Sequence, residues 1–145
     1  MGASLLKLCA PLQKLELALG VTPITVLEAF DYIVILENEA QVRSINPNFS
    51  IMQNLDLRGV VITAPGDEVD FVSRCFFPSL RVNEDPVTGS AHCELAPYWS
   101  EQLNKKTLVG KQLSQRTGMV KCEVIDDKVI LEGNAVDYMS GVIHL

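Results

Sequence analysis

The chain has 145 residues, of which 48% are hydrophobic and 21% charged, so it has enough apolar material for a buried core and too much for a disordered chain. Its length is typical of one domain. Twelve basic and eighteen acidic residues give a net charge of −6. This balance argues against a nucleic-acid partner, because domains that bind nucleic acid carry a basic face.

The cysteines and the first residues bear on the compartment. The four cysteines lie far apart, with neither the density of a secreted disulfide framework nor the spacing of a metal site, so we expect buried thiols and no metal. No apolar run approaches the ~20 residues that span a bilayer. The apolar stretch before Lys7 is too short for a signal peptide. We therefore predict a cytoplasmic protein without membrane contact.

The first half of the chain mixes helical and strand patterns. Apolar residues at three- and four-residue intervals predict a helix over residues 4–19, broken at Pro11 and ended by Gly20. A polar block at residues 38–57 predicts two short helices. β-branched and aromatic residues predict strands at residues 24–29, 32–36, 59–63 and 69–77.

The second half predicts one conspicuous helix followed by strands. From Ala91 the helix is apolar nearly all round, as in buried helices, and Pro97 should kink it. Turns at residues 126–127 and 133–134 separate the last of the predicted strands, at residues 109–113, 119–125, 128–132 and 135–139. The pattern predicts an α+β domain with a mixed or largely antiparallel sheet, curled as a half-barrel around one central buried helix.

The segment from Asn83 to His92, N-E-D-P-V-T-G-S-A-H, carries the chemistry. Small residues at Thr88, Gly89 and Ser90 let a ligand approach the backbone where the helix begins. Free N–H groups and the positive end of the helix dipole make such a start a ready anion site. Asp85, next to it, is a candidate proton acceptor or a hydrogen-bond partner for a polar substrate group.

A plainer interpretation stays open, because Asp-Pro before Thr-Gly-Ser is also an ordinary helix start with Pro in the first turn. Two other kinds of site are excluded. Gly110-Lys111 lacks the glycine spacing of a phosphate-binding loop. Ser90 lacks the G-x-S-x-G context of a serine hydrolase.

These residues resemble a known family. The run Glu84–His92, Pro97-Tyr98-Trp99 and the stretch Gln112–Arg116 are similar to the second half of phenazine-biosynthesis (PhzF-like) isomerases. Residues 70–78 and 133–136 match its flanking strands. The resemblance covers essentially the whole chain. It implies one domain, 1–145, equivalent to the second half of a two-domain protein with the diaminopimelate-epimerase-like fold.

The resemblance also implies a reaction: cofactor-free proton transfer that isomerises a small carboxylate metabolite. Asp85 would be the catalytic residue, and Gly89, Ser90 and Ala91, with Thr88 at the helix start, would bind the substrate carboxylate. No cofactor and no metal are implied. Thiol chemistry is not implied either, because Asp-Pro stands where related epimerases have a cysteine.

Two departures from the family pattern matter. The first half of the family supplies a general acid/base glutamate and a Gly-His pair, and neither has a counterpart in these 145 residues. Thr117 replaces the usual Gly of an Arg-Gly-Gly turn, so the turn is strained if that position needs a positive φ.

The absence of the glutamate leaves three functional hypotheses. The chain can be an isomerase half that forms a homodimer or pairs with a separately encoded first half, because an isolated half exposes a face that needs a mate. It can be a non-catalytic anion-binding or interaction module. It can also be a truncated relative without activity.

Overall fold

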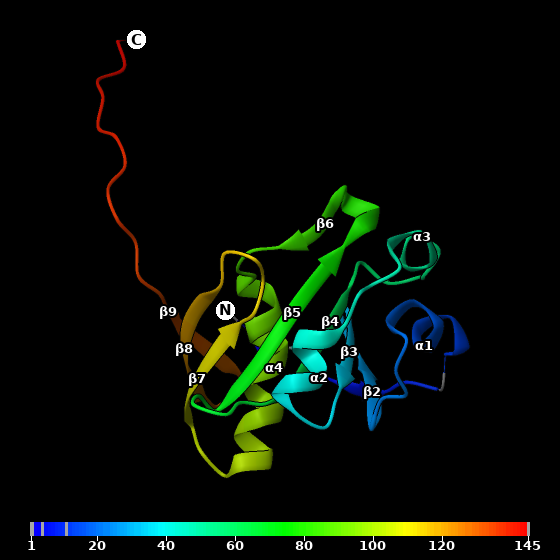
Figure 1. Ribbon diagram of the computed structural model, residues 1–145. Helices are drawn as coiled ribbons and strands as arrows, with labels where there is room; N and C mark the ends of the chain where they lie inside the picture. Colours follow the sequence, from blue (N-terminus) through cyan, green and yellow to red (C-terminus); the bar gives the residue numbers. More distant parts are fainter. Residues whose placement is uncertain (1, 4, 11, 145) are drawn as a thin grey trace.

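The strands of the described residues all belong to one mixed sheet. The computed structural model describes residues 2–3, 5–10 and 12–144 (Figure 1). Its strands are β1 (Lys7–Leu8), β2 (Thr25–Glu28), β3 (Tyr32–Ile35), β4 (Val60–Pro65), β5 (Phe71–Phe77), β6 (Val82–Asp85), β7 (Thr107–Gln112), β8 (Gly118–Ile125) and β9 (Lys128–Glu132). The strand order is β1-β2-β3-β4-β5-β7-β8-β9, and β6 pairs with β5. The β3–β4 and β5–β7 pairs are parallel.

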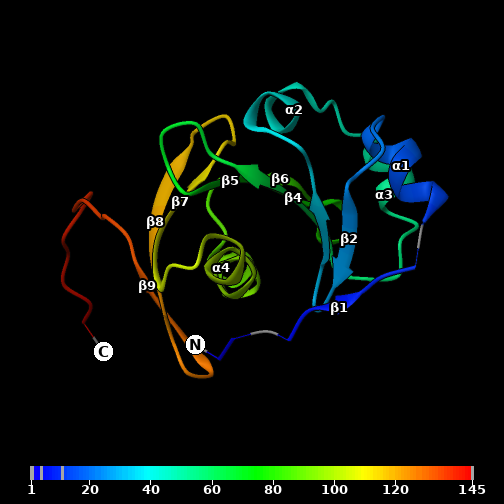
Figure 2. The same ribbon diagram turned by 90° about the horizontal axis from the view of Figure 1, so that it is seen from below.

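Helices cover both faces of this sheet. They are α1 (Gln13–Leu19), α2 (Glu39–Ser44), α3 (Phe49–Met52) and α4 (Gly89–Leu103), with a 3-10 turn at Pro78–Leu80. Figure 2 shows α1 and α3 on the side of the sheet away from α4. Gly20 ends α1 with a φ of 68°, as predicted. The mixed α+β class and the two short helices between residues 38 and 57 are confirmed.

Two cores follow from this layering. Along β3, Tyr32 and Val34 point to the core under α1–α3, whereas Ile33 and Ile35 point to the core around α4. Both faces of the central strands are therefore buried, which explains why the strands are continuous apolar runs rather than alternating patterns.

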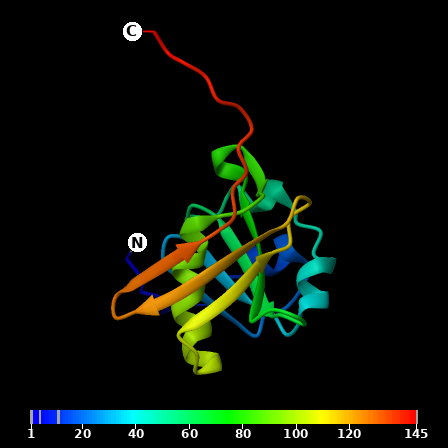
Figure 3. The same ribbon diagram turned by 90° about the vertical axis from the view of Figure 1, so that its left-hand side faces the viewer.

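α4 is the most buried helix of the described chain, and it continues through Pro97. It contacts β7, β8 and β9, which cross beside it in Figure 3. Near its end Trp99 stacks on Phe71, with 6.1 Å between ring centroids. The Trp99 indole N–H also donates to Thr63 Oγ1 at 3.0 Å. No helix in the described residues has the length and hydropathy of a membrane span.

The helix predicted over residues 4–19 is wrong in its first part. Residues Lys7–Leu8 form the edge strand β1, and α1 begins only at Gln13. Leu5 and Leu8, which suggested a helical stripe, are 82% and 77% exposed. Ser4 and Pro11 lie outside the described residues. The spacing of Leu5 and Leu8 is therefore not that of a buried face, whereas Leu15 and Leu19 within α1 are buried.

The strand predicted at residues 135–139 is also wrong. After β9, residues 133–144 form neither helix nor strand and leave the sheet as an extended segment (Figure 1). Strand-forming residues such as Val136 and Tyr138 have no neighbouring strand to pair with. The turn at Asp126-Asp127 is confirmed, since β8 and β9 pair there through Ile125 and Lys128.

Candidate functional site at the start of α4

Asp85 is positioned by a short edge strand. It ends β6, opposite Cys75 of β5. Pro86 and Val87 then lead to Thr88, which precedes α4 with an extended backbone (φ −112°, ψ 104°). The Thr88 hydroxyl donates to Asp85 Oδ2 at 2.5 Å. The carboxylate is thus fixed immediately before the helix begins.

Gln112 holds this segment to the sheet. It is fully buried at the end of β7. Its Oε1 accepts from the Thr88 N–H at 2.8 Å, and its Nε2 donates to the Asp85 carbonyl at 2.7 Å and to Thr88 Oγ1 at 3.1 Å. Our sequence reasoning assigned no role to Gln112. The available signal was a polar side chain at an inward position of a strand, two residues after Gly110.

Thr88 is therefore not a surface residue of the site. It is buried, and both its N–H and its hydroxyl bind groups of the protein itself. This geometry gives Thr88 a part in orienting Asp85. Its direct contact with a substrate stays a prediction.

The first backbone N–H groups of α4 are uncapped, and those of Gly89 and Ser90 lie in residues that reach the surface. Because the Thr88 hydroxyl turns to Asp85, no side chain caps the helix. Among the described residues, none accepts a hydrogen bond from the N–H of Gly89, Ser90 or Ala91. Gly89 is exposed and Ser90 half-buried, whereas Ala91 is fully buried. Such a start attracts an anion through its N–H groups and the helix dipole.

A charged cluster that the sequence did not reveal adjoins Ser90. Arg58 donates to both carboxylate oxygens of Asp31 and, at 3.0 Å from Nη2, to Ser90 Oγ. Glu94 Oε1 accepts from the N–H groups of Phe30 and Asp31. We call Asp31, Arg58 and Glu94 the Arg58 cluster. Its members come from three separate parts of the chain, so no local motif could announce it.

Burial favours the protonated form of Glu94. The side chain is fully buried, and its Oε2 has no partner among the described residues. Burial and the neighbouring Asp31 carboxylate raise the pKa of Glu94 to about 8. With Glu94 in this form, the Arg58 cluster contains one negative and one positive charge.

Two surface cavities flank the segment from Asp85 to Ser90. One, of about 560 Å³, lies beside the helix start and is lined by Ala29, Phe30, Ser90 and Cys93 together with residues of the N-terminal segment. The other, of about 420 Å³, is lined by Glu84, Pro86, Ser114, Gln115 and Arg116. A ligand bound to the amides at the start of α4 could therefore extend into the first of these cavities, which Phe30 lines.

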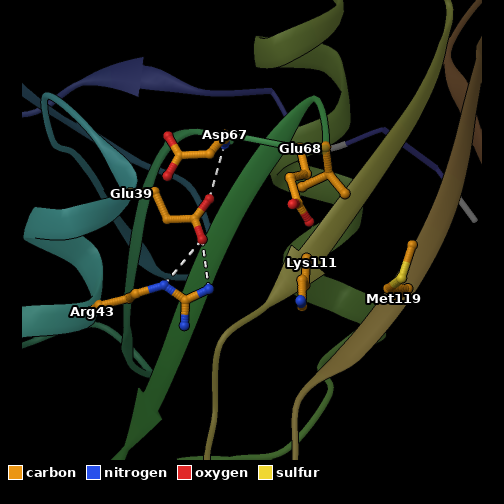
Figure 4. A pocket seen from close by; sticks show the side chains of 7 residues that line it. Glu39, Arg43, Asp67, Glu68, Lys111 and Met119 are labelled. Atoms are coloured by element: carbon orange, nitrogen blue, oxygen red, sulfur yellow. Dashed lines mark hydrogen bonds and ion pairs between the residues drawn. The ribbon is translucent and has the colours of Figure 1, made fainter.

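A third cavity, of about 520 Å³, lies away from the helix start (Figure 4). Two of its charged groups pair with each other: Arg43 binds Glu39, which also accepts from the Asp67 N–H. Among the lining residues, Lys111 comes from β7. Nothing in this arrangement leaves a buried polar group for a ligand.

Two other ionisable residues of the motif, Glu84 and His92, already bind groups of the protein. Glu84 forms a two-point ion pair with Arg74, whose Nη1 also donates to the carbonyls of Val42 and Ile45. His92 is fully buried, and burial lowers its pKa. Its Nδ1 lies 2.7 Å from the Thr88 carbonyl, which only accepts, so Nδ1 carries the hydrogen.

The described cysteines are reduced, and Cys93 lines the cavity beside Ser90. The four cysteines form no disulfide, and burial raises the thiol pKa values of Cys75, Cys93 and Cys122. Within the described ranges, no three His, Cys, Asp or Glu side chains are grouped as metal ligands.

Comparisons with known proteins converge on one family. The PhzC-PhzF model, described as phenazine biosynthesis-like protein, matches residues 7–141. The chain is 48% identical over 121 residues to an uncharacterized isomerase of Halalkalibacterium halodurans, covering 81% of this chain and 46% of that protein. It is 44% identical over 137 residues to an uncharacterized isomerase of Pseudomonas aeruginosa, covering 94% of this chain and 53% of that protein.

Solved structures agree. A PhzF-family phenazine biosynthesis protein of Enterococcus faecalis superimposes with a TM-score of 0.87 and 46% identity, covering 90% of this chain and 50% of that chain. A PhzC/PhzF protein of Clostridium difficile gives a TM-score of 0.91 with 39% identity, covering 100% of this chain and 56% of that one. The chain thus spans about half the length of the relatives that it matches.

Proposed function

The chain belongs to the phenazine biosynthesis-like (PhzC/PhzF) family, and on this premise we propose that it is the second half of an isomerase that acts on a small carboxylate metabolite. The open amides of Gly89 and Ser90 bind the carboxylate, with the uncapped N–H of the buried Ala91 behind them, and Asp85 takes part in proton transfer beside it. The observation that carries this proposal is an uncapped helix start next to an oriented carboxylate.

The chemistry needs no cofactor. A proton leaves one carbon of the substrate and returns to another, so the substrate is neither oxidised nor reduced. The amides bind the carboxylate and withdraw charge from it, which favours loss of a nearby proton. Asp85 serves as the group on this side of the substrate that hydrogen-bonds to it or holds the proton.

The fold belongs to the same proposal. We infer that the sheet curls around α4 as one diaminopimelate-epimerase-like half, and that the chain corresponds to the second half of its relatives. The coverage of 46% and 53% of two related proteins supports a match to about half of their length, and the assignment to the second half depends on the resemblance of residues Glu84–His92. The cytoplasmic location stays a prediction.

A partner completes the site in this proposal. The second proton-transfer group comes from a first-half domain, supplied by another chain or by a second copy of this one. The segment 133–144 supports a missing neighbour, because its apolar side chains are at least 83% exposed: Val136, Tyr138, Met139, Val142 and Ile143. A strict monomer at high concentration in analytical ultracentrifugation would argue against the second copy.

One observation favours a second candidate function, a non-catalytic anion-binding module. In the described chain, two other ionisable side chains of the motif are already committed: Glu84 to Arg74, and His92 to the Thr88 carbonyl. Without a partner the site would then bind a carboxylate and move no proton.

Deuterium exchange separates the two candidates. The chain is mixed with the first half of the Pseudomonas aeruginosa relative in D₂O and incubated with a panel of small carboxylic acids, and mass spectrometry measures deuterium on carbon. We expect incorporation that falls by a factor of about 10²–10⁴ in Asp85→Asn. Asp126→Asn, in the exposed β8–β9 turn, is the matched control. Unchanged exchange in Asp85→Asn would refute the role of Asp85, and acid binding without any exchange would favour the module.

A further inference from the structure

We propose that Arg58 is a positioning residue of the anion site: anchored by Asp31, it donates to Ser90 Oγ and so directs the Ser90 hydroxyl hydrogen toward the bound carboxylate. This inference rests on the proposed function, and it extends the site to the Arg58 cluster, which no sequence motif marks.

The guanidinium of Arg58 is held in a fixed orientation. Its Nε lies 2.9 Å from Asp31 Oδ1 and its Nη2 lies 2.5 Å from Asp31 Oδ2, and the Asp31 side chain is fully buried. The guanidinium also lies over the Phe77 ring, 5.2 Å from its centroid. Next to it, a Cβ on Gly59 would come within 2.2 Å of that ring, so only glycine allows this approach. A two-point pair of this kind constrains both atoms that donate.

The Ser90 hydroxyl has one hydrogen to give and can accept two hydrogen bonds. Its oxygen accepts from Arg58 Nη2 at 3.0 Å. Its own hydrogen must then point away from Arg58, and no described residue accepts it. Ser90 is the second residue of α4, so this hydrogen joins the open N–H groups of the same helical turn.

The third member of the Arg58 cluster, Glu94, lies on α4, the helix that also carries Ser90. Glu94 lies one turn after Ser90, and its Oε1 accepts from the N–H groups of Phe30 at 2.9 Å and Asp31 at 3.2 Å. α4 thereby fixes the turn that carries Asp31, and Asp31 fixes Arg58. Because burial favours the protonated form of Glu94, the cluster in that form adds no net negative charge that would repel an anion.

Arg58 is not fully committed to the ion pair. Its side chain is 36% exposed, and its Nη1 donates to no residue that the structure describes. If the Arg58–Asp31 ion pair only stabilised the fold, it would not need the additional hydrogen bond from Arg58 to Ser90.

The test is an NMR titration of the ¹⁵N-labelled chain with sodium acetate, following the amides of Gly89, Ser90 and Ala91. Arg58→Met should weaken acetate binding by a factor of about five to ten, the range expected when the net contribution of one ordinary hydrogen bond is lost. In a Ser90→Ala background the same change should weaken binding by less than about twofold. Arg43→Met, which breaks the Arg43–Glu39 ion pair on α2, is the matched control.

Each result decides the matter. Equal weakening by Arg58→Met in both backgrounds, or no weakening at all, would overturn the positioning role. If Arg58→Met does not fold, Arg58→Lys replaces it, since lysine keeps the charge but has no fork to bind Asp31 and Ser90 together. Full acetate affinity in Arg58→Lys would also overturn the proposal. Failure of the unmodified chain to bind acetate would instead refute the proposed function.

Discussion

Replacing Gln112 by methionine is expected to release the segment that carries Asp85 without changing the volume of the core. The glutamine amide makes three hydrogen bonds, to the Thr88 N–H, the Asp85 carbonyl and Thr88 Oγ1. Methionine has nearly the same length and shape and can make none of them.

The cost follows from the groups left behind. The Thr88 N–H lies in a buried residue, whereas the half-buried Asp85 carbonyl can regain water in part. A buried polar group without a partner costs about 1–3 kcal/mol, so we expect the free energy of unfolding to fall by about 2–3 kcal/mol. For a chain of this size that lowers Tm by about 4–12 °C.

Urea denaturation followed by Trp99 fluorescence measures this loss, because Trp99 is the single tryptophan and is buried against Phe71. Hydrogen exchange at the Thr88 amide shows whether the segment opens locally. Gln115→Met, at an exposed position three residues later, is the control. Equal stability of the Gln112→Met and Gln115→Met variants, with the Thr88 amide still protected, would refute the reasoning.

Three further predictions concern other parts of the molecule. Thr117 has a φ of 56°, as its place in the Arg-Thr-Gly turn suggested, and Thr117→Gly should raise the free energy of unfolding by about 1 kcal/mol in urea denaturation. Glu94 binds its proton more tightly in the folded state, so stability should fall as pH rises from about 5 to about 8; thermal melts of Glu94→Gln should lack this fall. Arg74→Met leaves Glu84 and two carbonyls without their donor and should cost about 2–4 kcal/mol by the same denaturation assay; a smaller loss than for Arg43→Met would contradict it.

The sequence predicted those elements whose pattern is local. Gly20 as the end of α1 and the Asp126-Asp127 turn depend on backbone preferences at single residues, and both occur. The apolar runs of β3 and β4 were recognisable because both faces are covered. Strand β6 was missed, because its short polar stretch is a strand only through pairing with β5.

The candidate site divides in the same way. The motif could mark Asp85 and the small residues of the helix start, since they are adjacent in sequence. It could not reveal Arg58, because the bond to Ser90 joins residues that are 32 positions apart. Nor could the motif reveal that Gln112 binds Thr88 and Asp85, since these contacts depend on the parallel pairing of β5 with β7.

The central claim is that the opening amides of α4 bind a carboxylate. Its most direct test is a comparison of acetate with acetamide, a neutral molecule of similar size, on the unmodified ¹⁵N-labelled chain. We predict saturable shifts of the Gly89, Ser90 and Ala91 amide signals with acetate and none with acetamide. Signals that stay in place with both molecules, or move equally with both, would contradict the claim.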